Sequence, residues 1–350
     1  MVLEPFDKSI FRWGILSTAN IARMQVVPAI QCSANGRAVA VASRDIVNAR
    51  AFAARFGIER AYGSYDELLA DPDIDGIYIA LPNAQHVEWT LRSARAGKHV
   101  LCEKPIAMHA RDLDALMTAG REAGRLISEA YAVCYHPQWS KVRDIVSSGA
   151  IGRLRHVQGT YSYFVDDPGN PRNQASLGGG ALRDVGGYPL MVTRWVSGAE
   201  PARICANIEI DPATGVDIHA AVRADFGSFD LEFYCSGRMA LRQSMVFHGD
   251  AGFIEVHAPF NAGVYDHPRI DVHDRHHRQA TTFRFPGVQQ YLLEVEAFAA
   301  VASGHSGTVL SLGDSLATQL AIDAAFESST TGGWVTVGNQ ANPPFDTARN

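Results

Sequence analysis

Two residues that could move a proton stand four positions apart in the segment GGGALRDVGGYPLM, which spans residues 178 to 191. Asp184 carries a carboxylate and Tyr188 a phenol, and their spacing places both on one face of the helix that is predicted to begin there. A phenol can donate a proton, and its phenolate can accept one. The three glycines ahead of them would let the backbone approach another group closely. Tyr188 also has a structural interpretation, as a ring that fills an interface.

The elements that must position these residues begin with an alternating pattern in the first part of the chain. Short β-prone runs (FRWGIL, AVAVAS, GIYIAL and KHVLCE) alternate with helices predicted from Ile21 to Cys32 and from Val47 to Phe56. This pattern is typical of βαβ units with a parallel sheet that is covered on both faces. We therefore predict an α/β fold with an N-terminal Rossmann dinucleotide-binding domain at residues 10–130.

The chain changes character after Tyr131. Longer β-prone stretches, such as RLRHVQGTYSYF and ALRQSMVFHG, follow one another with few helices between them. The pattern predicts a C-terminal α+β domain at residues 131–310 with a large open, mostly antiparallel sheet. A final helix at residues 311–330, capped by Ser311, is expected to pack back on the Rossmann domain.

The first strand ends in GILSTANIARM, where a dinucleotide site would carry G-x-G-x-x-G or A. Ser17, Ala19 and Ala22 occupy the three glycine positions. Their small side chains still let the loop approach a pyrophosphate, which the amides of the next helix would bind. A plain tight turn between strand and helix is the alternative.

The second strand ends in VASRD, with Ser43 and Arg44 where an NAD site usually carries an acidic residue. A guanidinium suits a 2'-phosphate and therefore favours NADP over NAD. The alternative is a surface arginine that pairs with Asp45.

Two further strand ends meet the same edge of the predicted sheet. LPNAQHVEW places Leu81, Pro82, Asn83 and His86 at the carboxyl edge, where doubly wound sheets bind ligands. Lys104 of VLCEKPIAM follows the next strand, at the place where a nicotinamide ring would lie. His86 could instead be an ordinary helix residue and Lys104 a solvated surface charge.

Composition excludes several classes of protein. The chain has 350 residues, 47% of them hydrophobic, which is enough for two domains with large cores. A formal net charge of -6 gives no electrostatic support for a nucleic-acid partner. No run approaches the apolar length of a membrane span, and the first residues lack a signal-peptide pattern, so we expect a cytoplasmic protein.

Cysteine and histidine usage gives no sign of a metal site. The five cysteines form no CxxC pair and are expected to be reduced thiols. His267, His273, His276 and His277 cluster in YDHPRIDVHDRHHRQA, but their alternation suits an exposed hairpin. We therefore expect no metal.

Several motifs in order resemble one family. WGILSTANIA, LPNAQHVEW, KHVLCEKP, EAYAVCYHPQW, DPGNPR, LGGGALRDVGGYPL and GDAGFIEVHAPFN are similar to those of the glucose-fructose oxidoreductase, inositol dehydrogenase and MocA family of NAD(P)-dependent oxidoreductases. The resemblance covers nearly the whole chain. Tyrosine at position 188, where many relatives have histidine, resembles the branch of aldose dehydrogenases and dihydrodiol dehydrogenases. Relatives in this branch commonly carry an arginine where this chain has Cys134, which leaves the substrate open.

The resemblance implies roles for individual residues. Lys104 and Tyr188 would act at the reacting carbon, with the charges of Lys104 and of the cationic nicotinamide ring lowering the pKa of the phenol. Asp184, Asn170 and Arg172 would face the substrate. The NADP cofactor (NAD being the alternative) would be held by Ser17, Thr18, Ala19, Asn20, Ile21, Ser43, Arg44, Leu81, Pro82, Asn83, His86, Glu103 and Lys104.

The resemblance implies an NADP-dependent oxidoreductase acting on a hydroxyl or carbonyl carbon of a sugar or polyol. The preferred hypothesis is oxidation of an aldose such as D-xylose at C1 to the lactone. Keto-sugar reduction, trans-dihydrodiol oxidation and oxidation of a glycoside or nucleotide-sugar hydroxyl are alternatives within enzymes, and an NADP-binding regulatory protein is the alternative outside them. The open sheet is expected to form a homodimer or a larger homo-oligomer.

Overall fold

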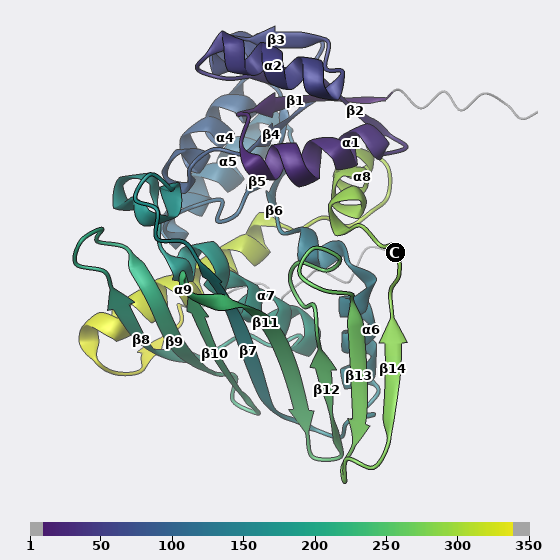
Figure 1. Cartoon of the computed structure of the whole chain (residues 1–350), viewed down its shortest axis with the longest axis vertical. Helices are drawn as coiled ribbons and strands as arrows, with labels where there is room; N and C mark the ends of the chain where they lie inside the picture. Colours follow the sequence, from purple (N-terminus) through teal and green to yellow (C-terminus); the bar gives the residue numbers. More distant parts are fainter. Residues whose placement is uncertain (1–9, 339–350) are drawn as a thin grey trace, which may run out of the picture.

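Two sheets that lie one above the other organise the computed structural model, which describes residues 10–338 (Figure 1). The first sheet has six parallel strands in the order β3-β2-β1-β4-β5-β6. The order reverses between β1 and β4, and such a reversal opens a crevice at the carboxyl ends of the strands. The strands are Phe11–Leu16 (β1), Gly36–Ala42 (β2), Arg60–Tyr62 (β3), Gly76–Ile79 (β4), His99–Glu103 (β5) and Ile127–Ala130 (β6).

Helices cover both faces of this sheet, as the nearly continuous apolar strands require. Trp13 of β1 is fully buried, with its ring 5.2 Å from that of Phe298. Phe298 belongs to helix α8, which arrives from far along the chain and lies beside α1 (Figure 1). The helical segments are Ala22–Val26 (η1), Val27–Cys32 (α1), Ile46–Phe56 (α2), Tyr65–Leu69 (α3), Asn83–Gln85 (η2), His86–Arg95 (α4), Ala110–Asp112 (η3), Leu113–Ala123 (α5) and Gln290–Ala302 (α8).

The second sheet has nine strands in the order β14-β13-β12-β11-β7-β10-β9-β8-β15. All neighbours in it are antiparallel except β10 and β7. The strands are Leu154–Phe164 (β7), Arg203–Ile210 (β8), Asp217–Asp225 (β9), Asp230–Ser236 (β10), Arg238–Gly249 (β11), Gly252–Val256 (β12), Arg269–Asp274 (β13), Ala280–Arg284 (β14) and Val335–Thr336 (β15).

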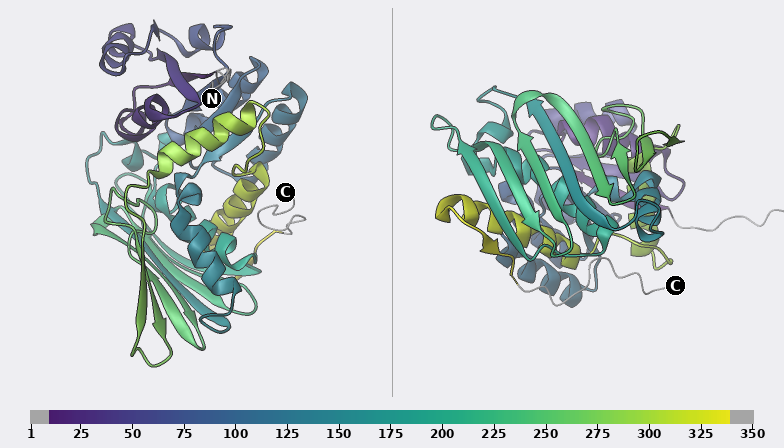
Figure 2. Two further views of the ribbon diagram at one scale, coloured as in Figure 1. Left: turned by 90° about the vertical axis from the view of Figure 1, so that its right-hand side faces the viewer. Right: turned by 90° about the horizontal axis from the view of Figure 1, so that it is seen from below.

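Helices pack on one face of the second sheet. Buried residues of β10, such as Leu231 and Phe233, form a core with Leu190 and Met191 of α7. In the part of the chain that the structure describes, no helix lies over the other face (Figure 2). The helical segments on this side of the molecule are Ala132–Tyr135 (η4), Pro137–Ser147 (α6), Pro171–Asn173 (η5), Ala175–Leu177 (η6), Leu182–Gly186 (η7), Gly187–Ser197 (α7) and Leu312–Thr331 (α9).

Helix α9 links the two cores. Ser311 and Asp314 form a capping box that fixes its start. Leu312 packs against the core of the first sheet, whereas Ala321 and Ile322 belong to the core of the second. The predicted domain limits at residues 130 and 310 stay a prediction, since α8 and α9 both return toward the first sheet.

The architecture confirms the predicted α/β fold class, with a parallel Rossmann sheet followed by a mostly antiparallel open sheet. Among the described residues, no helix combines the length and the apolar character that crossing a membrane would take.

Candidate active site

A cleft of about 730 Å³ opens at the carboxyl edge of the first sheet and extends to the loops of the second. It brings together most of the residues singled out from the sequence. From that set, the cleft is lined by Ser17, Ala19, Asn20, Ile21, Arg44, Leu81, Pro82, Asn83, His86, Glu103, Lys104, Asn170, Arg172, Asp184 and Tyr188. Thr18 and Ser43 do not line it.

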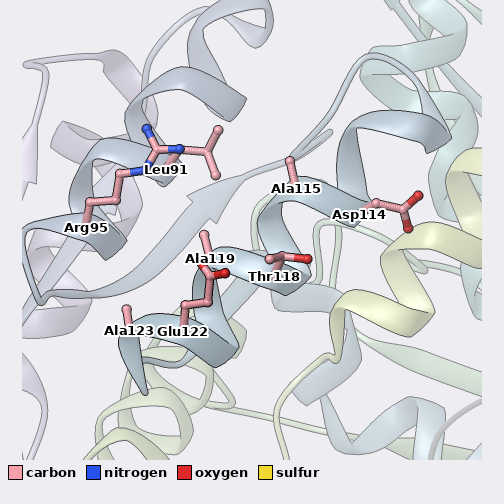
Figure 3. Close-up of a pocket in the computed structure, with 8 residues that line it drawn as sticks. All are labelled: Leu91, Arg95, Asp114, Ala115, Thr118, Ala119, Glu122 and Ala123. Atoms are coloured by element: carbon pink, nitrogen blue, oxygen red, sulfur yellow. The ribbon is translucent and has the colours of Figure 1, made fainter.

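Another groove, of about 550 Å³, lies between α4 and α5 (Figure 3). Its lining includes Arg95, Asp114 and Glu122, and none of the predicted site residues. The site chemistry therefore belongs to the cleft between the two sheets.

The turn after β1 fits a pyrophosphate. Ser17 has φ 97, a left-handed conformation that glycine usually supplies, and its Oγ accepts a hydrogen bond from the Ala19 amide at 3.1 Å. The helix begins at Asn20, and the amides of a first helical turn have no partner within the helix. The small Ala19 and the buried Ala22 leave these amides and the positive end of the helix dipole accessible to an anion.

Arg44 at the end of β2 is an exposed guanidinium on the cleft wall. Among the described residues, Arg44 forms no ion pair with Asp45, whose carboxylate caps α2 by accepting from the backbone amide of Val47 at 2.8 Å. The Ser43 side chain makes a local hydrogen bond, in which its Oγ accepts from the backbone amide of Asp45 at 3.3 Å. Arg44 is thus available to a phosphate group.

His86 ties two strand ends together. It is fully buried, and its ring nitrogens lie 2.8 Å from the carbonyl oxygens of Pro105 and Leu81. Burial lowers the pKa of His86, whereas the two carbonyl acceptors raise it. Its place at the cleft is to hold the segments that carry Leu81 and Lys104.

Lys104 meets Asp184 and Tyr188 across the two sheets. Its Nζ donates to the main-chain oxygen of Asp184 at 2.6 Å and to Oδ1 of the same residue at 2.9 Å. The ammonium lies 5.2 Å from the centre of the Tyr188 ring. The side chains of Lys104 and Asp184 are each only 12% exposed. The four-residue spacing of Asp184 and Tyr188 therefore does direct both toward one lysine.

The second carboxylate oxygen of Asp184 is also fully engaged. Oδ2 accepts from the Tyr163 hydroxyl and from Nε of Arg172, both at 2.7 Å. Burial alone would raise the pKa of Asp184, but the charges of Arg172 and Lys104 and the hydrogen bonds outweigh it and hold this pKa well below its usual range. Asp184 is therefore a permanent anion between two cations.

Tyr188 stands in an aromatic cage, where Lys104 alone does not lower its pKa. Its ring centre lies 5.2 Å from Tyr131, 5.5 Å from Tyr161 and 5.3 Å from Phe260. Burial raises the pKa of Tyr188 well above its ordinary value. Lys104 does not offset this effect, because its charge is shared with the Asp184 carboxylate. Tyr188 is a neutral phenol at physiological pH.

The three glycines ahead of Asp184 are required by their backbone conformation and by close packing within the protein. Gly178 and Gly180 have φ 77 and φ 122, a region that disfavours other residues. A Cβ at Gly179 would overlap the backbone oxygen of Arg172, and one at Gly180 would overlap the Asp217 carboxylate. The close approach expected from the glycines is therefore to Arg172 and Asp217 of the protein itself, and Gly179 and Gly180 also line the cleft.

Several residues of the cleft had no signal in the sequence. Tyr291, for example, lies at the start of helix α8. Cys134, by contrast, does not line the cleft, and its Sγ lies 3.1 Å from Sδ of Met191. The unforeseen lining residues include Met24, Gln25, Tyr65, Tyr161, Asn261, Val264 and Tyr291.

The histidine-rich segment is a hairpin, with His273 on β13 and the next two histidines in the turn to β14. In the described chain, the group with metal-ligand spacing is Glu255, Asp271 and His273. Asp271 is already bound by His257 at 2.7 Å and by Arg269 at 3.0 Å. This group is therefore explained by ion pairs on the sheet.

Glu129, buried behind Lys104 on β6, makes stability depend on pH. Its carboxylate accepts from the Ile106 amide at 2.9 Å, and burial raises its pKa to about 7. An ordinary glutamate has a pKa of about 4.3. The folded chain therefore holds this proton more tightly than the unfolded chain, and stability falls as pH rises from about 4 to about 7.

We expect Glu129→Gln to remove this loss, because glutamine keeps the shape without the charge. Its melting temperature should exceed that of wild type by a few degrees at about pH 8 and match it at about pH 4. Thermal unfolding of both proteins across this range tests the expectation. A variant that is less stable than wild type at the alkaline end would contradict it.

The fold and the site together define the class of dinucleotide-binding oxidoreductases, with a Rossmann sheet, an anion-binding turn and a lysine and a tyrosine at the carboxyl edge. The chain belongs to the GFO/IDH/MocA family. The family model for its NAD-binding Rossmann domain, described as an oxidoreductase family, matches residues 11–131. The family model for the GFO/IDH/MocA C-terminal domain matches residues 139–255.

Three similar proteins cover nearly the whole chain. An uncharacterised oxidoreductase of Rhizobium meliloti is 42% identical over 94% of this chain and 99% of its own length. D-xylose 1-dehydrogenase (NADP(+)) of Haloferax volcanii is 33% identical over 91% of this chain and 98% of its own. The crystal structure of a 3-ketoreductase from Actinomadura kijaniata in complex with NADP and TDP-benzene is 28% identical, with a TM-score of 0.85 over 91% of this chain and 98% of that one.

Proposed function

We propose that the protein is an NADP-dependent sugar oxidoreductase that oxidises the C1 hydroxyl of an aldose such as D-xylose to the lactone. The observation that carries the proposal is the meeting of Lys104, Asp184 and Tyr188 in one cleft with the anion-binding turn. The similarity to an NADP(+)-dependent D-xylose 1-dehydrogenase supports the choice of cofactor and substrate.

The residues of the cleft fit the cofactor in its separate parts. The turn from Ser17 to Ile21 would hold the pyrophosphate, and Arg44 the 2'-phosphate. When bound, NADP supplies the ring that accepts or gives the hydride. Lys104 would lie beside that ring, because it follows β5 at the same edge of the sheet.

The protein's own contribution to the reaction is a proton transfer. Tyr188 would exchange a proton with the hydroxyl oxygen of the sugar as the carbon is oxidised or reduced. Asp184, fixed by Arg172 and Tyr163, holds the Lys104 ammonium beside the Tyr188 ring. Because burial raises the pKa of Tyr188, oxidation should speed up as pH rises, whereas reduction finds the phenol already protonated.

The protonated Tyr188 also favours a second candidate function, reduction of a keto-sugar. A neutral phenol is the form that protonates an alkoxide. The similar structure of a 3-ketoreductase agrees with this alternative. Oxidation of trans-dihydrodiols remains a third candidate, and a regulatory protein that binds NADP without turnover is the hypothesis outside enzymes.

Absorbance of reduced nicotinamide, followed with a panel of aldoses, keto-sugars and dihydrodiols, tests these functions. Oxidation of D-xylose with NADP, and formation of its lactone, is the expected result. Turnover of keto-sugars alone would show that the function is keto-sugar reduction and not aldose oxidation. NADP binding with no turnover of any member of the panel would support the regulatory hypothesis.

We expect Arg44→Ala to raise the KM for NADP about 10- to 100-fold and to leave the KM for NAD within about threefold, because only NADP carries the 2'-phosphate. Arg50→Ala, on the exposed side of α2, serves as the matched control. Steady-state kinetics with each cofactor measure the change. An equal rise for both cofactors would show that Arg44 does not bind the 2'-phosphate.

The proposal includes a cytoplasmic location, which suits the five free cysteines. It also includes a homo-oligomer, most simply a homodimer, formed through the open face of the second sheet. A sugar or polyol is the proposed small-molecule partner.

A further inference from the structure

A hydrogen-bonded pair of uncharged side chains lies on the cleft wall close to Tyr188. Tyr161 belongs to β7, and Asn261 to the loop between β12 and β13. Both line the cleft, and the Asn261 Nδ2 donates to the hydroxyl oxygen of Tyr161. Neither residue is among those assigned a role above.

The loop that carries Asn261 is held by three buried glutamines. Gln138 and Gln290 donate to carbonyl oxygens of residues 258–260, at distances from 2.9 to 3.3 Å. Oε1 of Gln243 accepts from the backbone N–H of Asn261 at 3.1 Å. All three side chains belong to residues that are at most 4% exposed, so these bonds are protected from water. Asn261 therefore has a fixed position at the cleft.

The ring of Tyr161 is fixed as firmly as Asn261. It stacks on Phe260 with centres 5.2 Å apart and an angle of 8° between the planes. Its centre lies 5.5 Å from that of Tyr188. The pair is therefore close enough to Tyr188 to contact the same small molecule.

Each member of the pair keeps one hydrogen-bonding function for a ligand. Within residues 10–338, the hydrogen bond between the two side chains leaves Oδ1 of Asn261 as an acceptor and the O–H of Tyr161 as a donor. Burial raises the pKa of Tyr161, so its proton stays in place. A hydroxyl group, which both donates and accepts, is complementary to this pair.

We propose that Asn261 and Tyr161 together bind one sugar hydroxyl other than the reacting one and so determine specificity. The hydroxyl donates to Oδ1 of Asn261 and accepts from Tyr161. This inference rests on the proposed function, since it takes the ligand of the cleft to be a sugar. It also selects an uncharged sugar: Arg172, the cation near this wall, is bound to Asp184, and Oδ1 would repel a phosphate or carboxylate.

Kinetics with D-xylose and with its analogues that each lack one non-reacting hydroxyl test the pairing. We expect the wild-type kcat/KM to be about 10- to 100-fold lower for one of these analogues. Asn261→Ala and Tyr161→Phe should both reduce this discrimination to less than about threefold, and for the same analogue. Tyr161→Phe keeps the stacked ring, and Asn207→Ala, at an exposed position of β8, should keep the wild-type preference.

Two kinetic results would overturn the proposal. In one, the variants lose activity equally toward D-xylose and every analogue, which is the behaviour of a merely structural role. In the other, the two variants relax discrimination at different hydroxyls.

Calorimetric binding separates this inference from the proposed reaction. D-xylose and the analogues are titrated into NADP-saturated Tyr188→Phe protein, with and without Asn261→Ala. A preference for D-xylose that Asn261→Ala removes supports the pair even if wild type turns over no sugar, a result that would refute only the reaction. Equal binding of all the sugars, or equal absence of binding, overturns the pair whatever the turnover.

Discussion

We expect Tyr188→Phe to lower kcat for sugar oxidation about a thousandfold and to leave the dissociation constant for NADP within about twofold. Positioned acid-base groups contribute about 10²- to 10⁴-fold to rate, and this substitution removes the proton-transferring hydroxyl alone. The phenylalanine ring keeps the contacts with Tyr131, Tyr161 and Phe260. Steady-state kinetics and calorimetric titration with NADP measure the two quantities.

The pH dependence gives this prediction a second readout. In wild type, the oxidation rate should rise with pH up to an apparent pKa above the ordinary value of tyrosine, because burial disfavours the phenolate. The residual rate of Tyr188→Phe should lack this rise. Tyr234→Phe, on β10, is the control for loss of a hydroxyl elsewhere. A Tyr188→Phe protein that stays within tenfold of wild type and keeps the pH profile would contradict the role of Tyr188.

The sequence predicted those parts of the site that follow a strand end. Arg44, Asn83 and Lys104 follow within four residues of the ends of parallel strands, and the carboxyl ends of such strands meet at one edge of the sheet. Periodicity alone therefore places them together. The short strands β3 and β6 were not predicted, because three or four residues give too little pattern to recognise.

Residues brought in by tertiary packing left no comparable signal. Tyr163 reaches Asp184 from β7, and Asn261 reaches Tyr161 from a loop 100 positions along the chain. No local pattern distinguishes these side chains from ordinary residues of a strand or a loop. The position of Tyr291 at the cleft likewise follows from α8 packing on the first sheet.

The pKa of Tyr188 shows why charges cannot be inferred from residue types alone. A lysine beside a tyrosine suggests a lowered pKa. The sequence did not reveal that Asp184 takes the ammonium of Lys104 at 2.9 Å or that three aromatic rings surround the phenol. The pKa of Tyr188 therefore follows from the burial of its phenol and from the pairing of the Lys104 ammonium with the Asp184 carboxylate.

Lys104→Met should lower kcat/KM about 10²- to 10³-fold, the size usual for loss of a positioned group that stabilises developing charge. Methionine is similar in length but has no ammonium to place 5.2 Å from the Tyr188 ring. Lys141→Met, on α6 over Phe283, is the control for loss of a lysine. Activity within threefold of wild type would refute a catalytic role for Lys104.

The same substitution should also destabilise the protein, since, within the described residues, it leaves the buried Asp184 carboxylate with Arg172 as its one remaining cationic partner. Adding Asp184→Asn to Lys104→Met removes the uncompensated charge, so the double variant should regain much of the lost melting temperature. It should not regain activity, because the ammonium is still absent. Recovery of stability without recovery of activity would show that the Lys104 ammonium has two separate roles, one in the reaction and one in the stability of the fold. If both return together, Lys104 serves the fold alone.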